Sequence, residues 1–247
     1  MSSIADFPDT DTALEEPNGL LAMGGDLSPG RLLEAYARGI FPWFSEPDPI
    51  LWWTPDPRMV LYPACFHASK SLKKSIKKQQ FEISLNGAFE DVMAACAGAR
   101  QASEGTWISP DMQSAYSHLH TLGLAHSLEV RVAGELVGGL YGVCLDRVFF
   151  GESMFSAVTD ASKTALFALA AVGQQGYFDL IDCQVYSQHL ARLGAEEIAR
   201  KDFETALSRA INSDYMTTAR EAVSRCVALE PAKWQQALPR VASDLLL

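Results

Sequence analysis

The chain has 247 residues, of which 48% are hydrophobic, and a formal net charge of −10. This length can bury a substantial core, in one large domain or in a small domain beside a larger one, and the net charge alone argues against a nucleic-acid partner. No apolar run reaches the length of a membrane span, and the acidic N-terminus is unlike a signal peptide. The five cysteines are widely spaced without a C-x-x-C pair, which indicates a reducing compartment, the cytoplasm, and no structural zinc.

The first element in chain order is a short helix over residues 28–39. Ser28 is placed as its N-cap, Pro29 occupies the first helical position and Gly39 follows its end. We predict that residues 1–58 form a small N-terminal α/β domain. A larger domain is expected over residues 59–220, and residues 221–247 are expected to form a C-terminal tail in which no motif indicates a function.

Residues 38–58 combine five aromatic residues with five prolines: Phe41, Trp43, Phe44, Trp52 and Trp53 among Pro42, Pro47, Pro49, Pro55 and Pro57. Proline fixes φ and removes a donor, so this segment is predicted to be neither a regular helix nor a central strand. A stiff loop of this kind displays its rings at little entropic cost. The rings either fill a domain interface or form a platform on which a ligand stacks.

Residues 57–81 contain no Asp or Glu, although the whole chain is acidic. The basic side chains of this stretch are Arg58, Lys70, Lys73, Lys74, Lys77 and Lys78. On a helix that begins near Ser69, the five lysines share one face, while Leu72 and Ile76 lie on the opposite face. A solvated helix face is the plain interpretation. A strip that binds phosphate groups is the alternative, because no acidic residue is present to pair with the lysines.

The remaining elements predict an α+β sheet domain. They are a helix over 109–123, strands over 126–132, 135–145 and 147–153, a helix over 161–176, a strand over 177–186 and a short helix over 187–194. The turn between the first two strands is placed at Ala133–Gly134, and the next turn at Asp146.

Three polar residues near strand ends are candidates for catalysis. Asp182 and Gln184 are two apart in an apolar strand, so their side chains are expected on one face of the sheet. Glu152 follows the apolar run Val148–Phe150 and is placed at a strand end. Such polar groups must find hydrogen-bond partners or line a cleft. Asp182 as a cap on a neighbouring loop is the alternative interpretation.

Several other mechanisms lack their motifs. The segment 151–155, GESMF, has no second glycine of a nucleophile elbow, and no Walker loop or G-x-G-x-x-G is present. Cys183 alternates away from Asp182 and is interpreted as a core cysteine, not as a nucleophile activated by His189. The histidines 118, 120 and 126 show no metal-ligand spacing, so no metal is expected.

A series of long motifs occurs in one order: EPNGLLAMGGDLSPGRLLEAYARGIFPWF, DPILWWTPDPR, EGTWIS, LVGGLYGV, FFGESMFS, ASKTAL and LIDCQV. From residue 16 to residue 200 the chain closely resembles the leucyl/phenylalanyl-tRNA–protein transferase family. The resemblance implies a transferase that moves Leu or Phe, with Met a further candidate, from aminoacyl-tRNA to proteins with an N-terminal Arg or Lys, marking them for degradation.

The resemblance also implies a GNAT acyltransferase-like fold for the larger domain. The segment 131–136, RVAGEL, departs at its last position from the pyrophosphate loop of acetyl-CoA users. This departure fits an acyl donor that is a tRNA and not a coenzyme. No cofactor is therefore expected.

The implied reaction is attack of a protein α-amine on the aminoacyl ester of the tRNA. By resemblance, Asp182 orients or polarises Gln184, which accepts a hydrogen bond from the amine, and Glu152 holds the cationic acceptor or its amine. Because the ester is already activated, positioning can supply much of the acceleration. Proton transfer through hydroxyl groups of the terminal adenosine remains an alternative.

The resemblance makes tRNA the source of the phosphates that Arg58 and the five lysines are expected to contact. It also assigns two further groups of residues. The rings expected to frame the terminal adenosine and the acceptor are Tyr36, Trp43, Trp107 and Tyr116. The residues expected to line the pocket for the Leu or Phe side chain are Leu140, Phe149, Leu166 and Leu169. Two other readings stay open: an acyltransferase with a small acyl donor, and a non-catalytic module that binds RNA or peptide.

Overall fold

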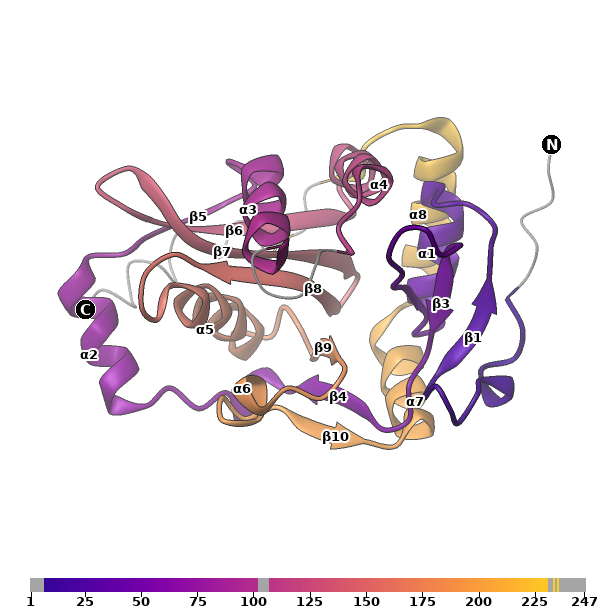
Figure 1. Cartoon of the computed structure of the whole chain (residues 1–247), viewed down its shortest axis with the longest axis horizontal. Coiled ribbons are helices and arrows are strands. Elements are labelled where there is room, and N and C mark those ends of the chain that lie inside the picture. Colours follow the sequence, from indigo (N-terminus) through magenta and orange to yellow (C-terminus); the bar gives the residue numbers. More distant parts are fainter. Residues whose placement is uncertain (1–6, 102–106, 231–232, 234, 236–247) are drawn as a thin grey trace.

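The computed structural model describes residues 7–101 and 107–230, together with residues 233 and 235. The described residues form a mixed α+β structure with helices on both faces of its larger sheet (Figure 1). The predicted α+β class is therefore confirmed. Within the described residues, no helix is both long enough and apolar enough to cross a bilayer.

The strands are β1 (Leu20–Met23), β2 (Phe41–Pro42), β3 (Leu51–Trp53), β4 (Arg58–Leu61), β5 (Glu82–Leu85), β6 (Ala125–Val132), β7 (Glu135–Leu145), β8 (Val148–Ser156), β9 (Leu180–Gln184) and β10 (Glu196–Ile198). The α-helices are α1 (Pro29–Ala37), α2 (Lys70–Gln79), α3 (Phe89–Gln101), α4 (Pro110–Thr121), α5 (Ala161–Gln174), α6 (Gln188–Ala191), α7 (Arg200–Ala210) and α8 (Ser213–Arg225). Two 3₁₀ turns among the described residues cover Thr10–Thr12 and Pro63–Cys65. The helices and strands predicted from residue 109 to residue 194 are all present.

The larger sheet has the strand order β10-β4-β9-β8-β7-β6-β5. Adjacent strands in this sheet run antiparallel, except β8 and β9, which run parallel and are joined through α5. A parallel pair needs such a crossover, because a tight turn can join only antiparallel strands. The pairing of β8 with β9 runs only from Val148/Leu180 to Phe150/Asp182. Beyond Phe150 and Asp182 the two strands no longer pair.

Apolar side chains of the sheet alternate between two core clusters on its opposite faces. In β7, Tyr141 and Val143 belong to the cluster that contains residues of α3 and α4, whereas Leu140 and Cys144 belong to the cluster that contains residues of α5. This alternation is the period of two expected for a sheet covered on both sides. In Figure 1, α3 and α5 lie on opposite sides of the central strands.

The N-terminal lobe contains a separate sheet of order β1-β3-β2, so the aromatic and proline-rich segment does supply a central strand. The prediction that this segment could not form a central strand was wrong. Residues 51–53 lie between Pro49 and Pro55 and include no proline, so their backbone N–H groups can pair on both sides. Trp52 is fully buried and its Nε1 donates to the Gly24 carbonyl over 2.9 Å, whereas Trp43 is 44% exposed.

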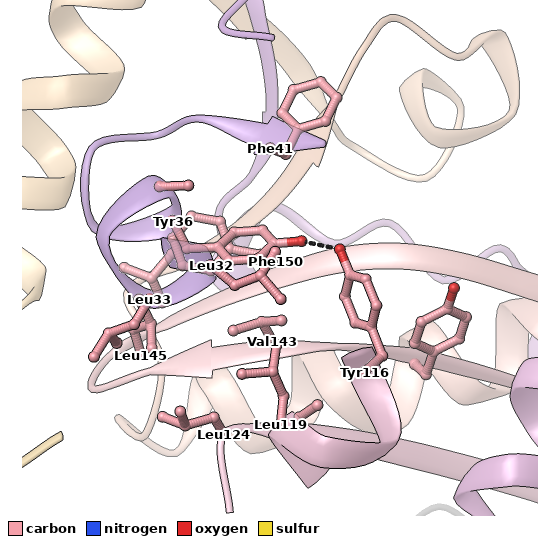
Figure 2. Packing of buried hydrophobic residues seen from close by; sticks show 14 of the residues in the cluster. Leu32, Leu33, Tyr36, Phe41, Tyr116, Leu119, Leu124, Val143, Leu145 and Phe150 are labelled. Atoms are coloured by element: carbon pink, nitrogen blue, oxygen red, sulfur yellow. Dashed lines mark hydrogen bonds between the residues drawn. The ribbon is translucent and has the colours of Figure 1, made fainter. Parts of the chain in front are cut away.

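The N-terminal lobe and the larger sheet share one hydrophobic core. Helix α1 packs against α8 and α4, and its Leu32 and Leu33 belong to the same buried cluster as Val143 and Phe150 of the sheet (Figure 2). Arg58 already belongs to β4, and α8 continues past residue 220. The division of the chain at residues 58 and 220 remains a prediction.

Helix α2 has the features that its sequence predicts. The Ser69 hydroxyl accepts a hydrogen bond from the Leu72 backbone N–H over 3.1 Å, which makes Ser69 the N-cap. Leu72 and Ile76 are buried against the core that contains α5. The side chains that remain exposed include Lys70, Lys73, Lys74, Lys77 and Lys78.

The contact between the N-terminal lobe and α7 can be tested at Gly39. This residue has φ +73°, and an added Cβ would lie 2.7 Å from Cε1 of the buried Phe203 ring. Gly134 has φ +81°, but a Cβ there would meet no atom within 4 Å. Gly39→Ala should lower the free energy of unfolding by about 1–3 kcal/mol more than Gly134→Ala, because only Gly39→Ala adds overpacking to backbone strain.

Urea denaturation of the two alanine variants measures this difference. Equal losses of stability would show that α7 does not press against the turn at Gly39.

Candidate active site

The candidate site lies where β8 and β9 stop pairing, and both strands are irregular there. In the pairing of β7 with β8, Tyr141 opposes Ser153 and Gly142 opposes Gly151, so Glu152 is an extra residue in a β-bulge. In β9, Gln184 has φ +65°, next to a register shift in the pairing with β4. Bulges re-aim side chains, so simple alternation along the strand does not determine where Gln184 points. Glu152 lies within β8 and not at its end, which corrects its predicted position.

An apolar cavity of about 240 Å³ opens beside these residues. All four residues predicted for an acyl side-chain pocket line it: Leu140, Phe149, Leu166 and Leu169. The cavity is smaller than the roughly 300–1,000 Å³ of sites that hold drug-sized ligands, and it suits a single apolar side chain. Met154 and Leu190 also line it, although no spacing in the sequence indicated them.

A second, smaller cavity of about 70 Å³ adjoins the first. Trp43 and Trp107, two of the rings that the resemblance assigns to the terminal adenosine, line it. Glu152 and Gln184 line both cavities and therefore lie at their junction. A carboxyl group and a carboxamide thus stand between an apolar pocket and an aromatic one.

A buried ion pair supports this junction. The Arg58 guanidinium donates from Nε and Nη2 to the two carboxylate oxygens of Asp182 over 2.8 and 2.6 Å, and their side chains are 1% and 0% exposed. The guanidinium carbon lies 4.8 Å from the centre of the Phe41 ring and 4.6 Å from that of Phe203. The prediction that Arg58 contacts tRNA phosphates is wrong, because its charge is buried and neutralised inside the protein.

The same ion pair fixes the backbone of Gln184. The Gln184 N–H donates to Oδ1 of Asp182 over 2.9 Å. Its side-chain Nε2 donates to Oε1 of Glu152, also over 2.9 Å, which leaves the Gln184 carbonyl Oε1 as the hydrogen-bond acceptor of this side chain. Asp182 therefore positions Gln184 through the backbone and does not reach its carboxamide directly.

Glu152 is held by two tyrosines. Its Oε1 lies 2.8 Å from the Tyr36 hydroxyl and its Oε2 lies 3.0 Å from the Tyr116 hydroxyl, and the two hydroxyls also hydrogen-bond to each other (Figure 2). Burial raises the pKa of Glu152 to about 7, against the lowering effect of the hydrogen bonds from Tyr36 and Tyr116. The nearby Asp182 carboxylate raises this pKa further.

The positions of Tyr36 and Tyr116 differ from those expected. Both side chains are almost fully buried, at 1% and 0% exposure, and neither lines the two cavities. They cannot frame an adenosine directly, because α1 and α4 bury their rings in the core behind Glu152. Their hydroxyls act on the site through the carboxyl group of Glu152.

Other candidate groups have structural roles. Cys183 is half-buried and lines the 240 Å³ cavity, and burial raises the pKa of its thiol well above the ordinary range, so the thiol stays neutral. Burial lowers the pKa of His126 to about 3. Among the described residues, no cluster of three or more His, Cys, Asp or Glu side chains could hold a metal ion.

Comparisons with known proteins identify the family. The family model described as leucyl/phenylalanyl-tRNA protein transferase matches residues 60–208, and the model of its N-terminal domain matches residues 25–56. The leucyl/phenylalanyl-tRNA–protein transferase of Nitrosospira multiformis is 56% identical over 86% of this chain and 91% of its own length. That of Methylococcus capsulatus is 52% identical over 94% of this chain and 92% of its own length.

Among solved structures, a ribosomal-protein-alanine N-acetyltransferase from Brucella melitensis biovar Abortus 2308 is 20% identical, with a TM-score of 0.31. The alignment covers 41% of this chain and 77% of the acetyltransferase. On the family models and the relatives together, the chain belongs to the leucyl/phenylalanyl-tRNA–protein transferase family.

Proposed function

We propose that this protein transfers Leu, Phe or Met from aminoacyl-tRNA to the α-amine of proteins that carry an N-terminal Arg or Lys, and so marks them for degradation. The observation that carries the proposal is the junction of the two cavities. An aminoacyl ester bound with its side chain in the 240 Å³ cavity would present its carbonyl carbon near Gln184 and Glu152. An acyl donor and an amine acceptor can meet there.

The proposed role of Gln184 is to orient the attacking amine. Its Nε2 is committed to Glu152, so Oε1 is the end that accepts a hydrogen bond from the amine. Asp182 keeps Gln184 in this position, and Arg58 holds the Asp182 side chain in place. The ester is already activated, so the positioning of amine and carbonyl supplies much of the acceleration.

The proposed acceptor specificity rests on charge. Glu152 is acidic and lines both cavities, whereas the Asp182 carboxylate is already paired with Arg58. A carboxylate favours a nearby cation, so an acceptor with an N-terminal Arg or Lys suits this junction better than one with an acidic first residue. The exposed lysines of α2 would contact tRNA phosphates.

A filter assay tests the function and the role of Gln184 together. Labelled Leu should pass from Leu-tRNA to a protein with N-terminal Arg, and not to the same protein with N-terminal Glu or an acetylated N-terminus. Gln184→Ala should slow this transfer by about tenfold or more with unchanged tRNA affinity, because Gln184 acts on the amine and not on the nucleic acid. Wild-type transfer by Gln184→Ala would remove this residue from the mechanism, and no transfer by the wild type would contradict the function.

The apolar cavity should set the choice of amino acid. Phe149→Ala removes a large wall, so Leu should lose more contact than Phe, and the ratio of Leu to Phe transfer should fall. The expected discrimination is on the order of 1–3 kcal/mol. Competition between Leu-tRNA and Phe-tRNA measures the ratio, and Phe81→Leu, in the same core cluster but outside the cavity lining, is the control. An unchanged ratio in folded Phe149→Ala would place the acyl pocket elsewhere.

The lysine face of α2 should control the dependence of tRNA binding on salt. Changing Lys70, Lys74 and Lys77 to Gln should weaken binding and lower the slope of log affinity against log salt concentration, because fewer counterions are released. The loss of affinity should be equal for Leu-tRNA and Phe-tRNA, since contacts to phosphates do not distinguish one tRNA sequence from another. Changing Lys163, which is paired with Asp160, is the matched control. An unchanged slope would leave α2 as a solvated face.

A further inference from the structure

The oxygen atoms around Glu152 form a closed ring. The hydroxyls of Tyr36 and Tyr116 contact different carboxyl oxygens of Glu152 and also each other, so three oxygen-to-oxygen hydrogen bonds join three side chains. Each hydrogen bond needs one proton, and the two tyrosines supply only two. The third proton must belong to Glu152. The ring is therefore complete only when Glu152 is a neutral carboxylic acid.

A further hydrogen bond to Glu152, from the side chain of Gln184, indicates which carboxyl oxygen carries this proton. Oε1 of Glu152 already accepts from the Tyr36 hydroxyl and from Nε2 of Gln184. Tyr116 donates to Oε2 when Glu152 is ionised. In the neutral acid Oε2 carries the proton, and the direction is reversed, so that Oε2 donates to the hydroxyl of Tyr116. Tyr116 in turn donates to Tyr36, and Tyr36 donates to Oε1, so each of the three protons lies in one hydrogen bond of the ring.

The surroundings of Glu152 have opposing effects on its carboxyl group, so the neutral and ionised forms are close in free energy near pH 7. The titratable or charged groups that face it are Tyr36 from α1, Tyr116 from α4 and Asp182 from β9, the last neutralised by Arg58 from β4. Burial and the Asp182 carboxylate disfavour a charge on Glu152, while the hydrogen-bond donors favour it. A pKa of about 7 lies just below that of a protein α-amine, about 7.7–8.0.

We propose that Glu152 is the base that takes a proton from the α-ammonium of the acceptor protein, and that the hydroxyls of Tyr36 and Tyr116 hold this proton in the closed ring. The proposal rests on the transfer reaction proposed above. One proton moves from the ammonium to Oε2 of the ionised Glu152. The neutral nitrogen then attacks the ester carbonyl carbon, the C–N bond forms and the bond from carbon to the ribose oxygen breaks.

The two protons that remain on the attacking nitrogen are also accounted for. The attacking nitrogen gives a second proton to the departing ribose oxygen and keeps the third in the new amide. Glu152 releases its proton to solvent after the product has left. In this scheme Glu152 is a catalytic residue, whereas Tyr36 and Tyr116, which do not line the cavities, are positioning residues.

The first test needs no tRNA and so does not depend on the transfer reaction. The carboxyl carbons of isotope-labelled glutamate are titrated by NMR in the free protein, and the Glu152 signal is identified by its loss in Glu152→Gln. The expected midpoint is about pH 7. A midpoint near the ordinary glutamate value of about 4.3 would overturn the protonated ring while leaving the proposed function intact.

The tyrosines are tested with the same readout. Tyr116→Phe removes the hydroxyl that closes the ring, so the midpoint of Glu152 should move away from its wild-type value. Tyr215→Phe removes the hydroxyl of a half-buried tyrosine, which donates to the Cys144 carbonyl outside the site, and should leave the midpoint unchanged. An unmoved midpoint in folded Tyr116→Phe would remove the tyrosines from the proposal.

The base is tested by single-turnover transfer at saturating acceptor. Glu152→Gln should be slower than the wild type by about a hundredfold or more at pH 7. The gap should narrow as pH rises past about 8, because the α-amine then loses its proton without a base. Glu34→Gln, on α1 and paired with Arg220, should keep the wild-type rate. A rate difference between wild type and Glu152→Gln that is below tenfold at pH 7, or that does not change with pH, would contradict the role of Glu152 as the base.

Discussion

The site depends on one buried ion pair, between Arg58 of β4 and Asp182 of β9. A buried carboxylate or guanidinium alone would be strongly destabilising, so each of the two requires the other. Arg58 also lies between the ring of Phe41 from the N-terminal lobe and the ring of Phe203 from α7. Within the described residues its Nη1 has no hydrogen-bond partner, and the ring faces provide the remaining surroundings. The pair thus joins the lobe, the sheet and α7 at one point, directly behind the junction of the two cavities.

Two irregularities in the sheet convert this fixed point into a site. The bulge at Glu152 and the left-handed conformation of Gln184 occur on neighbouring strands, just beyond the last paired residues. A carboxamide held by Asp182 and a carboxyl group held by two tyrosines therefore meet where an apolar cavity opens. The junction is rigid because its supporting residues are buried, which suits a reaction in which positioning supplies much of the acceleration. Its charge is adjustable, since burial raises the pKa of Glu152 to about 7 while Asp182 stays paired.

Much of this could be predicted from local patterns, and some of it could not. The period of the apolar residues predicted the hairpin of β6 and β7 and the helices α2 and α5, and the four residues of the apolar cavity followed from the family resemblance. The burial of Arg58 and its pairing with Asp182 could not be predicted from the neighbouring sequence. It belongs to a stretch without acidic residues, and its partner lies 124 positions away along the chain. Tyr36 and Tyr116 each come from an ordinary amphipathic helix, so only the packing of α1 and α4 shows that their hydroxyls meet at Glu152.

The most direct test replaces the ion pair as a unit. Arg58→Met and Asp182→Leu are made separately and together, and both the free energy of unfolding and single-turnover transfer from Leu-tRNA to a protein with N-terminal Arg are measured. Each single variant should lose about 3–5 kcal/mol, because it leaves an unpaired buried charge, whereas the double variant should recover most of that stability. The double variant should nevertheless transfer slowly, because Gln184 has lost the carboxylate that holds its backbone. Transfer at the wild-type rate by the stable double variant would contradict the claim that this pair positions the catalytic edge.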